Sequence, residues 1–452
     1  MKIYDNEKIE KNYLNDIKKL KKIILNKTLK QLNEDGVIVF PKTIKESVDL
    51  SDEQRVLWDK DKDYYQSGNV MGFIGVEDER LIIRSRFSKN SDDYFFKYLL
   101  SNVLDIPPVI ADLNTDMDLD DEFLQLLIFL FQYYLKRAMR SGLYKVYKRN
   151  NYNDLDVKGT IDVASHIKLN TPFTGMIAYS QREFSFDNYL MQLIRHTIEF
   201  INHLPFCKNP LNNIKDEIKQ IEESTPTYRV DERRKILYVN VKKTIRHGFY
   251  KDYYDLQKLC IWILMNKKHG IGYGKKRICG ILFDGSWLWE EYISNLIKDW
   301  YYHPNNRKRV GEQEIFRPIN CDNNCFNVGR MVPDFISKKK CEKKIIADAK
   351  YKPKDNIGKK NMDYFQILSY MIRFESNIGV FLYPEAENER EEKLFLLKGN
   401  TFEKNVEKRE DMYIVKQGLN IPKEYTDYKD FVSQIKNIEK VFKGKAEKGF
   451  IV

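Results

Sequence analysis

The spacing of apolar positions predicts both helices and strands along this 452-residue chain. Apolar residues recur at helical intervals over residues 9–32, which predicts one long amphipathic helix with a basic face. Short apolar runs between glycine, proline and charged residues predict strands. The predicted strands cover residues 36–41, 278–283 and 71–83, the last as a hairpin that turns at Asp78 and Glu79. Further helices are predicted at residues 122–140, capped by Asp120 or Asp121, at residues 187–200, capped by Asp187, and at residues 253–266.

The clearest local pattern is a predicted β-hairpin that carries acids in its apolar arms. Apolar runs at residues 331–336 and 345–349 flank a charged turn centred near Cys341. A symmetric hairpin about that turn pairs positions whose numbers sum to 682, and this sets Asp334 across from Asp348. Alternation along the second strand then directs Asp348 and Lys350 to one face.

Two carboxylates opposite each other in apolar strands repel one another and are costly to bury. A divalent metal ion between them would offset both effects. The alternative is an exposed hairpin whose charges are simply solvated, but that interpretation leaves the apolar setting of both acids unexplained. The pattern therefore favours a metal site at Asp334 and Asp348.

The order Pro333-Asp334 followed by Asp348-Ala349-Lys350 resembles the core of PD-(D/E)xK nucleases. The tract 346–352, together with Val157-Lys-Gly-Thr-Ile-Asp162 and Phe184-Ser-Phe-Asp-Asn-Tyr-Leu190, resembles the McrC family, the nuclease subunit of McrBC-type restriction systems. The resemblance extends from about residue 81 to residue 383. It implies an α/β fold in which a mixed-sheet nuclease core is flanked by helices.

The resemblance also assigns roles to individual residues. Asp334 and Asp348 match the metal-binding acids, and the Ala349 carbonyl adds an oxygen of the kind that Mg²⁺ prefers. Lys350 matches the lysine that orients or activates the attacking water and stabilises charge on the phosphate. Glu290 is the predicted acid from the preceding helix and a further metal ligand, with Glu291 as its rival. Gln366, on the helix after the core, is expected to orient the lysine or contact the DNA backbone.

Length and composition set the domain organisation. A chain of 452 residues with 42% hydrophobic content forms two or three globular domains. We predict a mixed or β-rich N-terminal domain at 1–118 that contacts the partner, a helical connecting region at 119–255 and the nuclease domain at 256–452. The longest apolar run is too short to span a bilayer and the N-terminus lacks a secretory segment, so a cytoplasmic location is expected.

Charge and cysteine content add two further indications. Residues 301–360 contain 15 Lys and Arg against 7 Asp and Glu, so much of the net charge of +11 lies around the predicted site. Such an excess suits contact with DNA phosphates, although a solvated hairpin tip explains any single lysine equally well. Cys321 and Cys325 form the only close cysteine pair and lack two further zinc ligands, which favours incidental thiols.

The chain contains no Walker A sequence, so we do not expect it to hydrolyse nucleotides. The resemblance implies an AAA+ GTPase motor as its partner. The leading hypothesis is a Mg²⁺-dependent DNA endonuclease subunit of an anti-phage restriction system. Two alternatives remain: a non-cleaving adaptor that anchors or stimulates an AAA+ partner on DNA, and a stand-alone nuclease. The sequence leaves open which bases are recognised and whether two copies must meet for double-strand cleavage.

Overall fold

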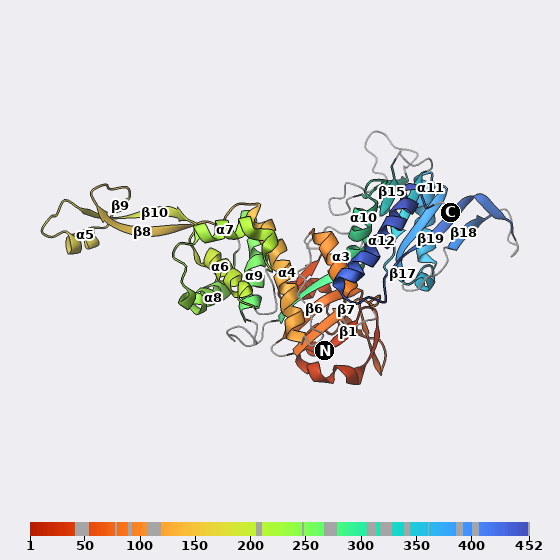
Figure 1. Ribbon diagram of the computed structural model, residues 1–452, viewed down its shortest axis with the longest axis horizontal. Helices are drawn as coiled ribbons and strands as arrows, with labels where there is room; N and C mark the ends of the chain where they lie inside the picture. The colour runs from red at the N-terminus through yellow and green to blue at the C-terminus, as the bar shows by residue number, and fades with distance from the viewer. Residues whose placement is uncertain are drawn as a thin grey trace. The chain divides into compact units, whose positions relative to one another are not determined.

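The protein has a mixed α/β fold, as the sequence predicts, in two compact units (Figure 1). One unit combines residues 1–108 with residues 275–452, and the other is formed by residues 109–274. The computed structural model describes residues 1–40, 54–76, 79–88, 93–105, 119–204, 210–245, 248–265, 278–304, 313–316, 328–338, 344–359, 361–385, 392–399 and 406–450.

This division differs from the predicted series of three consecutive domains. Strand β11 (Ile278–Asp284) lies between β6 (Val70–Val76) and β3 (Ile38–Phe40), antiparallel to the first and parallel to the second. Residues far apart in the sequence thus share one sheet, in the order β1-β7-β6-β11-β3, with β1 at Lys2–Tyr4 and β7 at Glu79–Arg84. The strands predicted at 36–41, 71–83 and 278–283 are confirmed within the described residues. Of the predicted turn, Asp78 lies outside the described residues and Glu79 begins β7. β11 lies outside the sheet that carries Asp348.

The long helix predicted over residues 9–32 is wrong. The segment forms β2 (Lys8–Glu10), a 3-10 helix (Lys11–Ile17), α1 (Lys18–Ile24) and α2 (Leu29–Glu34). The chain leaves the helical path where Asn26 has a φ of 59°. Thr28 then caps α2, because its hydroxyl accepts from the Gln31 N–H and the Gln31 side chain accepts from the Thr28 N–H. Leu14, Leu20, Ile24 and Leu32 are buried in one core with residues from the first sheet.

A second sheet in the same unit carries the predicted site. Its strand order is β12-β15-β16-β17-β19-β18, with β16–β17 and β17–β19 parallel and β15–β16 antiparallel. The strands are β12 (Tyr301–Tyr302), β15 (Phe335–Ser337), β16 (Ile345–Ala349), β17 (Ile378–Glu385), β18 (Glu392–Leu397) and β19 (Lys408–Asn420). Helix α11 (Met362–Arg373) contributes Ile367 and Met371 to a core that includes Phe381 of β17. Because Asp348 pairs in register with Phe381, Asp348 lies on the face that α11 covers.

Helix α10 (Gly285–Ile297) follows β11 and packs on β16, and α12 (Tyr428–Glu447) packs on α10 and β19. The side chain of Asp284 caps α10 by accepting from the N–H groups of Ser286 and Trp287. α3 (Tyr94–Leu104) also packs against α10. These contacts fix the helix that carries Glu290 to the sheet that carries the two aspartates.

The second unit is built on helices α4 (Leu119–Met139), α6 (Tyr189–Asn202), α7 (Lys215–Ser224), α8 (Arg233–Lys242) and α9 (Lys251–Met265). The predicted helices at 122–140, 187–200 and 253–266 are confirmed with shifted ends. Asp120 and Asp121 lie inside α4, which begins three residues earlier than predicted. Asn188, rather than Asp187, caps α6 by accepting from Leu190 and Met191 N–H groups.

The second unit also contains a β-structure that the sequence analysis did not predict. Strands β8 (Val146–Asp154) and β10 (Ile177–Ser185) pair over nine residues and extend away from the helices of the unit (Figure 1). β9 (Thr160–Ile161) and α5 (Val163–Leu169) lie at the far end. We call residues 146–185 the arm. Among the described helices of the chain, none combines the length and apolar character that a membrane crossing requires.

Candidate functional site

The strand register of the predicted hairpin is confirmed. Phe335 pairs with Ala347 and Ile336 with Ile346, so the paired positions sum to 682 as expected. Asp334 directly precedes β15 and Asp348 lies in β16, each one position beyond the Phe335–Ala347 pair, and they are 9% and 1% exposed. The first apolar run is divided, however, because residues 328–331 form a separate strand, β14, that pairs with β13 (Gln313–Phe316). The predicted turn at Cys341 lies outside the described residues.

The carboxylate of Asp334 is held by the backbone of the opposite strand. Its Oδ2 accepts a hydrogen bond of 2.7 Å from the N–H of Ala349. This bond brings the side chain of Asp334 next to the segment Asp348-Ala349-Lys350. The two acids and the Ala349 main chain are therefore neighbours, as the hairpin argument requires.

Lys350 lies at the centre of a compact polar group. Its Nζ is 2.7 Å from Oδ2 of Asp348, 2.9 Å from Oε1 of Gln366 and 3.8 Å from Oδ1 of Asp363. Burial opposes the charged form of this lysine, but Asp348, Asp334 and Asp363 outweigh that effect and raise its pKa above its ordinary value. Lys350 thus carries a proton at neutral pH, which suits charge stabilisation better than proton abstraction.

Gln366 joins this group from α11. Besides accepting from Lys350, its Nε2 donates to the Tyr370 hydroxyl over 2.9 Å. With both ends of the amide engaged, the oxygen is directed at the lysine. Of the two roles expected for Gln366, contact with the lysine is the one that this geometry supports.

Glu290 contacts His303, which in turn contacts Asp334. Oε1 of Glu290 is 3.6 Å from Nε2 of His303, whose Nδ1 lies 2.6 Å from the carbonyl oxygen of Asp334. Glu291, the rival acid, accepts instead from the indole N–H of Trp287 on its own helix. The contacts around the site thus favour Glu290.

The donor types at the site suit magnesium, which binds oxygen ligands. Among the described residues, no group of three or more His, Cys, Asp or Glu side chains converges closely enough to hold a metal ion. Magnesium in phosphate-handling sites commonly needs only one or two carboxylates, with water and substrate phosphate completing its shell. Asp334 and Asp348, with the Ala349 carbonyl, match that pattern, and Glu290, the further predicted ligand, contacts His303 beside them.

The segment after Lys350 is anchored to the N-terminal part of the same unit. The Tyr351 hydroxyl lies 2.6 Å from the Ser85 hydroxyl, and the Arg86 guanidinium donates to the Tyr351 carbonyl and stacks on its ring. Arg86 also pairs with the buried Asp5. The position of Lys350 therefore depends on residues more than 260 positions earlier in the chain.

Sequence reasoning missed three residues of this environment, namely His303, Asp363 and Arg86. Asp363 accepts from Lys352 and from the Gly358 N–H, and its pKa is lowered because these contacts outweigh its burial. Its place one helical turn before Gln366 was the available signal. His303 and Arg86 lie too far from the motif in sequence for any spacing rule to find them.

The predictions about the basic region and the cysteine pair can be compared with the structure for only a few residues. Most of the basic residues predicted to contact phosphates, and the Cys321–Cys325 pair, lie outside the described residues. Among the described ones, Lys338 donates to the Lys298 carbonyl and Lys359 donates to Asn356. Phosphate contact by the basic region stays a prediction.

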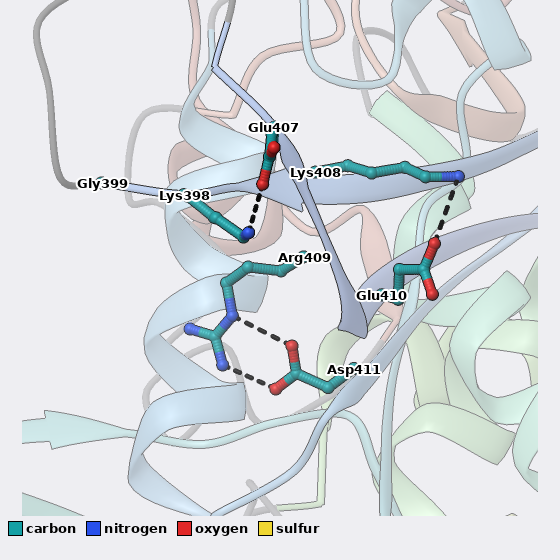
Figure 2. A pocket seen from close by; sticks show the side chains of 7 residues that line it. All are labelled: Lys398, Gly399, Glu407, Lys408, Arg409, Glu410 and Asp411. Atoms are coloured by element: carbon teal, nitrogen blue, oxygen red, sulfur yellow. Dashed lines mark hydrogen bonds and ion pairs between the residues drawn. The ribbon is translucent and has the colours of Figure 1, made fainter.

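A wide surface hollow of about 940 Å³ lies elsewhere, beside β18 and β19. Figure 2 shows that its charged side chains pair with one another: Lys398 with Glu407, Lys408 with Glu410 and Arg409 with Asp411. Three cations are balanced by three anions, so the hollow has little net attraction for phosphate or for a metal ion. The group around Lys350 is the better candidate for chemistry.

Comparison with known proteins decides the family. The profile of the family described as "McrBC 5-methylcytosine restriction system component" matches residues 65–384, which is more than half of the chain. The chain belongs to the McrBC family. The resemblance to the McrC family is therefore confirmed, and the matched residues include every candidate site residue considered above.

Two solved structures from Thermococcus gammatolerans also match the chain. One is a refined half-complex from a tetradecameric assembly of McrB AAA+ hexamers with bound McrC, with 16% identity, a TM-score of 0.46, and coverage of 97% of this chain and 99% of that one. The other is a cryo-EM structure of the McrBC complex, with 15% identity, a TM-score of 0.33, and coverage of 66% and 87%. No curated protein sequence matches the chain.

Proposed function

We propose that this McrBC-family protein is a Mg²⁺-dependent DNA endonuclease subunit that cleaves phosphodiester bonds together with an AAA+ GTPase motor. The observation that carries the proposal is the buried group formed by Asp334, Asp348 and Lys350 at the adjoining ends of β15 and β16. A protein that only binds a partner has no evident need for two buried acids and a largely buried lysine beside one another. Desolvation of charged groups costs free energy, and a surface that only binds a partner does not require that cost.

Each residue of the group has a distinct task in this proposal. Asp334 and Asp348, with the Ala349 carbonyl, would hold Mg²⁺, and Glu290 would approach from α10. The Lys350 ammonium would stabilise negative charge on the phosphate, and Gln366 would keep that ammonium in place through its 2.9 Å hydrogen bond. When bound, Mg²⁺ would polarise the phosphate and lower the pKa of water at the site.

The partner is proposed to bind the arm rather than residues 1–118. Among the described residues of 1–118, Tyr13 is the only large apolar side chain that is exposed. The arm instead exposes a series of apolar side chains around α5, none of whose residues is buried. These are Leu155, Val157, Ile161, Val163, Ile167, Leu169, Phe173 and Met176. Exposed apolar side chains gathered in one part of a fold are typical of protein interaction sites. This sequence contains no Walker A motif, so the proposed GTPase is a separate chain.

The competing function is a non-cleaving adaptor that stimulates or anchors an AAA+ partner on DNA. The apolar arm serves both functions equally well. Only the group around Lys350 separates them, because it concerns phosphate chemistry and not partner binding. The decisive experiment must therefore alter that group while leaving the arm intact.

The test is plasmid cleavage with Mg²⁺, with and without the co-expressed AAA+ protein, by the wild type and the Asp348→Ala and Asp348→Asn variants. We expect both variants to lose at least about 10²-fold in cleavage rate, because they remove a proposed metal ligand and with it several kcal/mol of transition-state stabilisation by Mg²⁺. Asp355→Ala is the matched control, since it removes an exposed acid seven positions away on the same segment.

GTPase stimulation of the partner is measured in parallel. Lost cleavage with preserved stimulation in the Asp348 variants, and full activity of Asp355→Ala, would support the endonuclease. A wild type that stimulates the partner but cleaves no DNA at any modification state tested would leave the adaptor as the function.

A further inference from the structure

His303 lies between Glu290 of α10 and Asp334, which directly precedes β15. It follows the short strand β12 and is neither a motif residue nor a residue that the family resemblance assigned. Its ring lies 5.1 Å from the ring of Phe335, centroid to centroid, and its side chain is 20% exposed. Phe335 is fully buried and is the residue that directly follows Asp334.

The hydrogen bonds of His303 fix the roles of its two nitrogens. The carbonyl oxygen of Asp334, 2.6 Å from Nδ1, can only accept, so Nδ1 carries the proton and donates. Nε2 is then the nitrogen that faces Oε1 of Glu290, at 3.6 Å, an ion-pair distance when the ring carries both protons. One side chain thus contacts the main chain of one proposed site acid and the carboxylate of another.

Asp334 is consequently held from two directions. The Ala349 N–H fixes its carboxylate from β16, and His303 fixes its carbonyl group from the β12 side. Glu290 lies on α10, a separate element that also packs on β16 and whose Trp289 indole donates to the Leu382 carbonyl. The His303 ring adds a contact between the Glu290 carboxylate and the main chain of Asp334.

We infer that His303 is a positioning residue, which aligns the Glu290 carboxylate with the Asp334 end of β15 so that both acids address the same metal ion and phosphate. This inference rests on the proposed nuclease function. It assigns His303 no contact with substrate. Residues that orient metal-site acids in this way typically contribute 10–100-fold to metal affinity or activity.

The first test is Mn²⁺ binding to the purified chain without DNA, followed by electron paramagnetic resonance. We expect His303→Ala to weaken Mn²⁺ binding about tenfold while the thermal midpoint changes little, since the side chain is partly exposed. His203→Ala is the matched control: His203 also contacts a main-chain carbonyl through Nδ1, at 2.6 Å from Glu199, but lies in the other unit. That variant should bind Mn²⁺ as the wild type does.

Two isosteric variants then separate the two contacts. The amide of His303→Gln reaches the position of Nε2 beside Glu290, whereas that of His303→Asn reaches the position of Nδ1 beside Asp334. We expect Gln to restore more of the Mn²⁺ affinity than Asn, and the Mg²⁺ concentration for half-maximal cleavage to follow the same order while KM for DNA stays unchanged.

The outcomes distinguish this inference from the proposed function. A wild type that binds no Mn²⁺ would overturn the metal site itself, and the inference with it. Wild-type binding together with unchanged binding in His303→Ala would overturn the positioning role alone. Equal losses in all three His303 variants, accompanied by equal drops in thermal midpoint, would mean that His303 supports the local fold and does not align Glu290.

Discussion

At the scale of single residues, the first unit contains several buried aspartates. Asp348, Asp5 and Asp93 are each less than 10% exposed, and each has a basic side chain close by. Asp5 is connected to the candidate site, because its partner Arg86 also donates to the carbonyl of Tyr351, directly after Lys350. The ionisation of Asp5 therefore bears on the stability of the segment that holds the lysine.

The pH dependence of stability tests this network. Burial raises the pKa of Asp5 from 3.8 to about 6, although Arg86 opposes the rise. The folded state thus binds the proton more tightly than the unfolded state, so the stabilising contribution is complete below pH 4 and is lost as the pH rises through 6. From the size of the shift, we expect the free energy of unfolding of the wild type to fall by up to about 3 kcal/mol relative to Asp5→Asn between pH 4 and 7.

Urea unfolding at several pH values across this window provides the measurement. Asp16→Asn, which removes an exposed acid from the same segment of the chain, is the control and should follow the wild type at every pH. Parallel pH profiles for the wild type and Asp5→Asn would contradict the expected burial of an ionisable carboxyl group at position 5.

At the scale of elements, the apolar pattern of the sequence predicted the strand register of one hairpin correctly but predicted one long helix where the chain forms several short elements. The register of β15 and β16 followed from two apolar runs and a charged turn, because alternation leaves few ways to pair a short hairpin. The helix over residues 9–32 failed because apolar spacing continues across a break. Leu25 there forms a bridge with Leu57, a contact that periodicity cannot reveal. The arm was missed because β8 exposes alternate polar residues on a strand with little apolar character.

Gly72 illustrates a constraint on strand pairing. Its φ is +128°, and a Cβ at this position would lie 2.2 Å from the carbonyl oxygen of Ile281 in the neighbouring β11. We expect Gly72→Ala to lower the free energy of unfolding by at least about 1–3 kcal/mol, from backbone strain alone, with the contact adding to it. Chemical unfolding of the purified variant measures the loss.

A glycine in a helix supplies the contrasting control. Gly444 lies in α12 with an ordinary φ, and a methyl group added at its Cα would meet nothing within 4 Å. Gly444→Ala should therefore stabilise by roughly 0.5–1 kcal/mol, because alanine is the better helix former. If both alanine variants shifted stability in the same direction, the close approach of β6 and β11 would not be the cause.

At the scale of the whole molecule, the chain leaves the first unit and later returns to it. The sheet β1-β7-β6-β11-β3 closes only when β11 inserts between strands formed some 200 residues earlier. Sequence analysis found β3, β6 and β11 separately but could not pair them, because the pairing is set by contacts distant in the chain. The same holds for the site: Asp334, Asp348 and Lys350 share one local motif, whereas His303 and Arg86 reach it only through the tertiary structure.

This topology makes the second unit separable in principle. The first unit has its own sheets and its own buried core. The second unit, residues 109–274, is inserted between α3, which ends at Leu104, and β11, which begins at Ile278. We expect a chain in which a Gly/Ser linker of about 20 residues, with a mean span of roughly 25 Å, replaces residues 109–274 to fold and to keep the site intact. It should lose association with the AAA+ partner, because the apolar arm is removed with the second unit.

Two measurements separate these expectations. Cooperative thermal unfolding together with retained Mn²⁺ binding would report an intact first unit, and size-exclusion chromatography with the AAA+ protein would report the lost association. The full-length chain with Ile167→Ser and Phe173→Ser is the matched variant, since it keeps every domain and removes only exposed apolar groups of the arm. Partner binding that survives in both proteins would place the docking surface in residues 1–108 or 275–452 instead. An unfolded linker chain would mean that β11 cannot join its sheet without the second unit.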